Sequence, residues 1–168
     1  VGGRYLTVSG AFNRATQALR QTGSASKPLI YATALDLGFS PLYTLIDDPT
    51  CCDIPGPNDY CPTNYTGRFE GEVTMVEALQ QSLNIPAVAL SETVGRENVR
   101  TVAENFGIVS ELAQGPALAL GASESTLVEM TGAYAGILNG GSAVKPYGLV
   151  ELRLSGESEP LLTATGGI

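Results

Sequence analysis

A chain of 168 residues is long enough for one ordinary domain with a buried core, and its 43% hydrophobic and 15% charged residues are typical of a globular protein. Its formal charge is -8 without any basic run, which argues against nucleic acid or an anionic lipid surface as a partner. The sequence contains no histidine, which excludes Ser-His-Asp and Cys-His catalysis and removes the usual zinc and non-haem iron ligands.

The sequence carries no recognisable membrane or targeting signal. No apolar stretch approaches the length of a bilayer span and no signal peptide is present, so we expect any membrane anchor to lie outside these residues. The abrupt start at Val1 and end at Ile168 lead us to expect a piece of a longer protein.

The first predicted helix follows a short β-like start over residues 1–20 and a loop at residues 12–16. The run Gly23-Ser24-Ala25-Ser26-Lys27-Pro28 predicts a tight turn that opens a helix ending near Gly38. Ser24 suits the N-cap of this helix, because its hydroxyl can accept from the unpaired N–H groups of the first turn. Pro28 is tolerated so early in a helix.

Ser24 and Lys27 are the first candidate catalytic residues. Their spacing of three places the hydroxyl and the amine on the same side of a helix, so a nucleophile and a candidate base come within reach of one another. The alternative is a helix cap followed by a solvated lysine. The same Ser-x-x-Lys pattern recurs at Ser142–Lys145, where the absence of helical periodicity predicts a loop.

Residues 39–72 are rich in proline and glycine and predict a long irregular excursion. Cys51, Cys52 and Cys61 lie within it. Neighbouring cysteines rarely bridge each other, so we expect a disulfide between Cys61 and one of the other two, in an oxidising compartment. Three reduced thiols or a partial metal site are the alternatives. Asn64-Tyr65-Thr66 matches a glycosylation sequon, but such triplets are common and we assign it no function.

Four further helices are predicted after residue 73. Thr74–Glu77 and Thr126–Glu129 are capping-box patterns, the first opening a helix that stops near Asn84 and the second a helix that stops at residues 139–141. Between them, one helix has Pro86 in its first turn and another ends at Gly107. Residues 108–122 are mostly loop. The residues predicted to face inward are Val76, Leu79, Leu83, Val88, Ala89, Leu90, Val99, Val102, Ala103, Phe106, Met130, Ala133, Tyr134 and Ile137.

One clear strand is predicted near the end of the chain, where Val150, Leu152 and Leu154 alternate with charged residues. We find no internal repeat. The composition of elements is therefore helix-rich, with too few strands for a closed sheet.

Ser82-Leu83-Asn84 lies at the predicted junction between two helices, where polar side chains can turn into a cleft. Taken alone, the triplet is also explained by Asn84 acting as a C-cap. The C-cap explanation becomes less convincing when the triplet is considered together with several other segments, which follow one another in a characteristic order along the chain. They are Asn13-Arg14-Ala15-Thr16-Gln17, Gly23-Ser24-Ala25-Ser26-Lys27-Pro28, Ala78-Leu79-Gln80-Gln81-Ser82-Leu83-Asn84-Ile85-Pro86-Ala87-Val88, residues 118–123 and residues 133–141.

These segments strongly resemble the transpeptidase domain of class A high-molecular-weight penicillin-binding proteins, over nearly the whole chain. The resemblance implies an α+β fold of the β-lactamase/transpeptidase type, of which this chain is the α-rich part, a helical subdomain with few strands and the main sheet largely missing. It implies that Ser24 is the acylated nucleophile, Lys27 its general base and Ser82 a proton relay, while Asn84 binds the substrate amide. No cofactor or metal is expected.

The implied activity is D,D-transpeptidation: Ser24 attacks the D-Ala–D-Ala bond of a peptidoglycan stem peptide, and the amine of a neighbouring stem takes the acyl group. β-Lactam antibiotics would acylate Ser24 in the same way. The implied location is the periplasmic or extracytoplasmic face of a bacterial cytoplasmic membrane, in a membrane-anchored parent with an N-terminal glycosyltransferase domain.

The sequence departs from the family pattern in its third motif. Lys-Thr-Gly or Lys-Ser-Gly is absent, since Thr165-Gly166 follows Ala164. We therefore expect residues 1–168 to be a single fragment of the domain, poorly active or inactive alone and able to associate with itself. The rival interpretations are a D,D-carboxypeptidase or serine β-lactamase, which transfers the acyl group to water, and a non-catalytic interaction module with the same fold.

Overall fold

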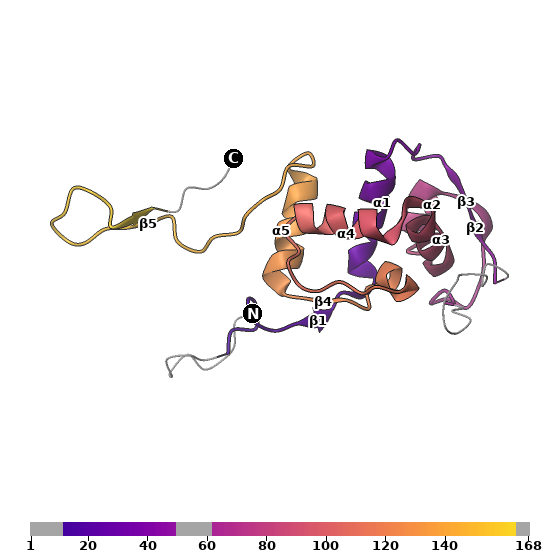
Figure 1. The fold of residues 1–168 in the computed structure, drawn as a ribbon, viewed down its shortest axis with the longest axis horizontal. Coiled ribbons are helices and arrows are strands. Elements are labelled where there is room, and N and C mark those ends of the chain that lie inside the picture. The colour runs from indigo at the N-terminus through magenta and orange to yellow at the C-terminus, as the bar shows by residue number, and fades with distance from the viewer. Residues whose placement is uncertain (1–11, 50–61, 164–168) are drawn as a thin grey trace.

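The computed structural model describes residues 12–49 and 62–163, which form a mostly helical body with three two-stranded antiparallel sheets (Figure 1). This confirms the prediction of a helix-rich chain with few strands. The helices are α1 (Lys27–Asp36), α2 (Met75–Gln80), α3 (Asn84–Val94), α4 (Arg96–Asn105) and α5 (Leu127–Leu138), with two 3₁₀ helices, η1 (Gly23–Ser26) and η2 (Pro116–Leu120). The strands are β1 (Arg20–Gln21), β2 (Thr44–Asp47), β3 (Gly71–Thr74), β4 (Glu124–Ser125), β5 (Glu151–Leu152) and β6 (Leu162–Thr163).

Helix α3 is buried on most of its sides and forms the centre of the main core. Val88 and Leu90 are fully buried, and Ile30 and Ala34 of α1 pack in the same cluster. Full burial of a Leu or Ile side chain contributes about 1.5–3 kcal/mol relative to exposure. This core fixes α1 against the start of α3, the two elements that carry the candidate site.

Both predicted capping boxes are present. Thr74 accepts from the N–H of Glu77 while the Glu77 carboxylate accepts from the N–H of Thr74, and Thr126 and Glu129 repeat the arrangement at α5. Each box satisfies two N–H groups that a helix start leaves without intrahelical partners.

The prediction that residues 39–72 are irregular is wrong near both ends of this segment, where strands β2 and β3 lie. Strands β2 and β3 pair antiparallel, with Leu45 opposite Val73 and Asp47 opposite Gly71. Four-residue strands separated by more than twenty residues give too little alternation to be detected from sequence. The pair matters for the site, because it brings Asp47 and the following segment toward α3.

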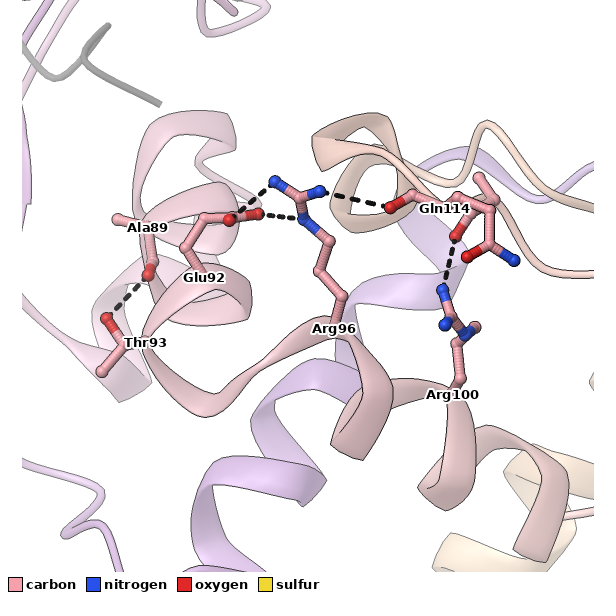
Figure 2. Close-up of polar contacts among 7 residues, drawn as sticks. Ala89, Glu92, Thr93, Arg96, Arg100 and Gln114 are labelled. Carbon is pink, nitrogen blue, oxygen red and sulfur yellow. Dashed lines mark hydrogen bonds and ion pairs between the residues drawn. The ribbon is translucent and has the colours of Figure 1, made fainter. Parts of the chain in front are cut away.

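A polar corner joins α3, α4 and the loop before η2 (Figure 2). Arg96 donates through Nε and Nη2 to the two carboxylate oxygens of Glu92, at 2.6 and 2.7 Å, and through Nη1 to the carbonyl of Gln114 at 3.2 Å. The neighbouring Ala113 N–H donates to Ser123 Oγ at 2.9 Å. The corner therefore braces the loop that contacts the segment around Ser123.

Helix α5 has the predicted bounds but only part of the predicted inward face. Ala133 is buried as expected, whereas Tyr134 and Ile137 are 45% and 39% exposed. The closest packing is made by glycine: a Cβ at Gly136 would lie 2.8 Å from the Phe106 ring. Small residues allow this close approach, while Met130 packs against the buried cluster that contains Ala133. In α2, Val76 is likewise exposed rather than inward.

The strand predicted near the end of the chain is only partly present. β5 contains two residues and pairs with β6, and both are exposed. In Figure 1 this hairpin lies away from the helical body. The alternation at residues 150–154 thus indicates a strand correctly, but no core covers it within the described residues.

Other sequence predictions concern membranes, thiols and metals. None of the described helices combines the length and hydropathy needed to cross a bilayer. Cys51, Cys52 and Cys61, and with them the predicted disulfide, lie outside the described residues. In the described part of the chain, no group of three or more His, Cys, Asp or Glu residues could hold a metal.

Candidate active site

The turn that carries Ser24 is anchored by backbone contacts to a distant loop. The N–H groups of Thr22 and Gly23 donate to the carbonyls of Ser123 and Gly121, at 3.2 and 3.1 Å. Gly121 has a φ of 69°, and a Cβ there would lie 2.1 Å from the carbonyl oxygen of Gly23. Only glycine therefore permits both the left-handed backbone and the close approach. The position of Ser24 is fixed by this contact.

Ser24 is not the N-cap that the sequence predicts. It lies inside the 3₁₀ helix η1, whose N-cap is Thr22, while Ser26 is the N-cap of α1. Neither N-cap residue makes a side-chain capping bond. The prediction is wrong because a 3₁₀ turn precedes the α-helix and moves its start to Lys27. As a result the exposed Ser24 hydroxyl is not used as a cap.

The same 3₁₀ turn brings Ser24 and Lys27 to one side of the chain. The N–H of Lys27 donates to the carbonyl of Ser24, an i to i+3 contact. In 3₁₀ geometry the side chains of residues i and i+3 eclipse one another, more closely than in an α-helix. The predicted arrangement of hydroxyl and amine on one face is thus supported by the local backbone.

Lys27 is buried and lies in a set of neutral oxygen acceptors. Its side chain is 1% exposed, and Nζ donates to Ser82 O at 2.6 Å, Ser82 Oγ at 3.1 Å and Asn84 Oδ1 at 2.7 Å. Burial lowers the pKa of Lys27 from 10.5 to about 8. None of the ion pairs among the described residues involves Lys27. The amine can therefore lose its proton without breaking an ion pair.

Ser82 occupies the position that ends α2. Its φ is 54°, in the left-handed region that glycine favours. The N–H of Leu83 donates to Ala78 O and that of Ser82 to Leu79 O, which is the hydrogen-bond pattern of a Schellman motif. The C-cap interpretation of Asn84 is therefore wrong. Because of this turn, the carbonyl and the hydroxyl of Ser82 both face Lys27.

Asn84 is the first residue of α3 and is held from two directions. Its Nδ2 donates to Thr63 O at 2.6 Å, and its backbone N–H donates to Asn64 Oδ1 at 2.8 Å. Sequence reasoning missed Asn64, which is 5% exposed, because the Asn-Tyr-Thr triplet was interpreted only as a sequon. No local pattern indicates its burial, which depends on β2 and α3.

A second residue missed by the sequence is Tyr134 of α5. Its hydroxyl donates at 2.9 Å to the carbonyl of Ala25, the residue that follows Ser24. By contrast, the second Ser-x-x-Lys match does not form a site: Ser142 and Lys145 are exposed and lie in a loop, as predicted.

The arrangement has the parts needed for nucleophilic catalysis. Hydrogen bonds join Lys27, Ser82 and Asn84, and the backbone places Ser24 one turn from Lys27. An exposed hydroxyl one turn from a buried amine of lowered pKa is the combination that a nucleophile and its general base require, and the hydroxyl to which that amine donates is Ser82 Oγ.

The comparisons with known proteins agree with one another. The family model described as the penicillin-binding protein transpeptidase domain matches residues 6–153. Penicillin-binding protein 1A of Rickettsia felis is 41% identical over 153 residues, which cover 90% of this chain and 19% of that protein. The chain therefore spans about a fifth of the length of the curated relatives it matches.

Solved structures of related proteins share the fold. A crystal structure of penicillin-binding protein 1A from Haemophilus influenzae has a TM-score of 0.83 and 35% identity, covering 95% of this chain and 24% of the other. Penicillin-binding protein A from M. tuberculosis, in an imipenem acyl-enzyme complex, has a TM-score of 0.74 and 26% identity, covering 90% of this chain and 40% of the other.

Proposed function

This chain belongs to the penicillin-binding protein transpeptidase family, in its class A, 1A-like branch, and from that premise we propose that it carries the acylating residues of a peptidoglycan D,D-transpeptidase. The observation that carries the proposal is the environment of Lys27: a buried amine of lowered pKa, without an ionic partner among the described residues, one turn from Ser24.

In the first step, Ser24 Oγ attacks the carbonyl carbon of a D-Ala–D-Ala bond and its proton passes to Lys27 Nζ. The tetrahedral intermediate collapses with cleavage of the C–N bond, and the leaving amine receives a proton from Lys27 through Ser82 Oγ. In the second step, the amine of another stem peptide attacks the carbonyl carbon of the acyl-enzyme and gives up a proton to Lys27. The C–O bond to Ser24 then breaks, and Lys27 returns the proton to Ser24 Oγ. The 3.1 Å contact between Lys27 Nζ and Ser82 Oγ supports this relay.

Asn84 keeps its proposed role in binding the substrate amide. Its Oδ1 accepts from Lys27 and its Nδ2 donates to Thr63 O. An amide group has two N–H donors and two acceptor lone pairs, so one of each remains for a peptide. Asn84 would thus position the base and the substrate together.

The proposed partners and location follow the family. We propose that β-lactams acylate Ser24, as imipenem acylates penicillin-binding protein A of M. tuberculosis, and that the protein works outside the cytoplasmic membrane on stem peptides. Residues 1–168 are proposed to be one part of a transpeptidase domain, in a membrane-anchored parent that also carries a glycosyltransferase domain. Alone, with no Lys-Thr/Ser-Gly in its sequence, the chain should react slowly and associate with itself, which light scattering would detect.

Labelling with a fluorescent penicillin tests the proposal in the complete protein, meaning this chain with the segments that flank it in its gene. Covalent label should appear on the wild type and be lost in Ser24→Ala. Ser142→Ala is the matched control, because it removes the serine of the second Ser-x-x-Lys match and should label normally. Label that survives Ser24→Ala would contradict the proposal.

Product analysis separates the rival functions. With a stem peptide and an amine acceptor, a transpeptidase forms the cross-linked product, whereas a carboxypeptidase releases D-Ala and leaves the acceptor unused. A folded complete protein that neither labels nor turns over stem peptide would favour the interaction module.

A further inference from the structure

Asp47 is a fully buried carboxylate without an ion pair among the described residues. It is 0% exposed, and it accepts from Asn64 Nδ2, at 3.0 Å through Oδ1 and 2.7 Å through Oδ2. Oδ2 also accepts from the N–H of Glu70 at 2.9 Å. Burying a charge is costly unless such donors surround it, so this carboxylate holds the amide of Asn64 firmly.

The contact with Asp47 decides which way the Asn64 amide points. Its NH₂ group donates to Asp47 and, at 2.9 Å, to the carbonyl of Arg68. A flipped amide would place Oδ1 against the carboxylate, where two acceptors repel. Oδ1 is therefore directed to the only remaining side, where it accepts from the N–H of Asn84 at 2.8 Å.

Asn64 thereby supplies a helix cap from outside the helix. The N-cap position of α3 is Leu83, which makes no side-chain capping bond and has no side chain able to accept one. Asn84, the first residue of α3, would otherwise lack an acceptor for its N–H. Thr63 O accepts from the side chain of Asn84, so Asn84 is held through both its backbone and its side chain. Its Oδ1 accepts from Lys27 Nζ at 2.7 Å.

We propose that Asn64, oriented by the buried carboxylate of Asp47, is a positioning residue that holds Asn84 against Lys27 for acyl transfer. The inference rests on the proposed function. It gives the Asn64-Tyr65-Thr66 triplet a role unrelated to glycosylation: Asn64 is buried, while Tyr65 and Thr66 are exposed.

The test measures the second-order rate constant for acylation of the complete protein by a fluorescent penicillin. Asn64→Ala should lower it roughly tenfold to a hundredfold, because a displaced base or substrate amide costs that much. Tyr65→Ala, a change at a fully exposed side chain in the same segment, should leave it unchanged. If Asn64 acts through Asn84, the double variant Asn64→Ala/Asn84→Ala should be no slower than the slower single variant. Losses that multiply would show only a structural role and overturn the inference.

A charge-swapped pair keeps the test decisive if Asn64→Ala does not fold. Asn64→Asp alone places two carboxylates together and should slow acylation. Adding Asp47→Asn restores the contact between these two side chains with donor and acceptor reversed, though not the donor to the Arg68 carbonyl, and should recover part of the rate. Failure of this recovery would overturn the inference. A folded wild type that is not acylated at Ser24 would instead overturn the proposed function, whereas normal acylation of Asn64→Ala would overturn the inference alone.

Discussion

Lys27 Nζ lies 2.6 Å from the carbonyl oxygen and 3.1 Å from the hydroxyl oxygen of Ser82, so one amine contacts the backbone and the side chain of the same residue. This double contact exists because Ser82 has a left-handed backbone, with φ 54°. The carbonyl and the hydroxyl together hold the amine, and in the proposed mechanism the hydroxyl is the route by which its proton leaves. The chemistry of the site thus depends on the turn between α2 and α3.

Removing the amine of Lys27 should abolish most acylation without unfolding the protein. Lys27→Met keeps an unbranched apolar side chain that is one atom shorter and deletes the base, so the acylation rate should fall by roughly 10² to 10⁴. Stability should change little, because loss of a buried charge offsets the hydrogen bonds lost at Ser82 and Asn84. Lys145→Met, in the exposed loop, is the control and should react normally. Unchanged acylation of Lys27→Met would remove this lysine from the mechanism.

The stability of the chain should rise with pH because of Lys27. Its pKa is lowered from 10.5 to about 8 by burial, so below pH 8 the amine is charged in both states and the burial penalty is fully present. Between pH 8 and 10.5 the unfolded chain binds a proton that the folded chain has released, and the free energy of unfolding increases, by up to about 3 kcal/mol. Burial raises the pKa of Tyr31, whose ionisation in the unfolded chain lowers stability above about pH 10.

Urea unfolding of the 168-residue chain from pH 7 to 10 measures this effect, and Lys27→Met isolates it. The wild type should gain stability relative to the variant as pH rises from 8 to 10. Parallel curves for the two proteins would show that Lys27 keeps an ordinary pKa.

Site features that depend on residues close in sequence could be predicted, whereas those that depend on residues distant in sequence could not. Thr74 and Thr126 were identified as capping residues because the signal lies within four residues. Ser24 and Lys27 were candidates from their spacing and became the expected pair only together with the other segments of the family resemblance, and the 3₁₀ turn before α1 was not predicted. Asn64 was missed, since its burial depends on Asp47 and Asn84, each about twenty residues away.

The fold shows the same limit. The two capping boxes predicted where α2 and α5 begin, but the start of α1, the end of α2 at Gln80 and part of the inward face of α5 could not be predicted. The apolar periodicity predicted that Tyr134 and Ile137 face inward. In the structure both are partly exposed, and Gly136 packs against Phe106. Ser82 gives a related case, because residue statistics favour Gly or Asn in a left-handed helix end and do not indicate serine.

Two substitutions of Ser82 should affect the stability of the protein differently but its acylation rate similarly. Ser82→Ala removes the hydroxyl and keeps a Cβ in the left-handed region, while Ser82→Gly removes both. Glycine at this position should be more stable than alanine by about 1 kcal/mol, since the left-handed backbone costs a Cβ-bearing residue that much. Both variants should acylate slowly to a similar degree, because each lacks the proton relay. Thermal unfolding and penicillin labelling check the two claims, and normal labelling of either variant would exclude the relay.

Any side chain at position 121 should lower both stability and acylation, because it would displace the turn that holds Ser24. Its φ is 69°, and Gly140 has nearly the same φ of 70° with nothing within 4 Å of an added Cβ. Gly140→Ala therefore pays only for backbone strain, about 1–2 kcal/mol. Gly121→Ala carries the same strain and also drives a methyl group to 2.1 Å from the carbonyl oxygen of Gly23. The backbone there must move, and Ser24 with it.

We therefore expect Gly121→Ala to be less stable than Gly140→Ala and to lose acylation, while Gly140→Ala labels like the wild type. The matched φ values make the comparison specific, because strain alone would affect both variants equally. Equal stability and equal labelling of the two would mean that the contact between Gly121 and Gly23 does not set the position of the nucleophile.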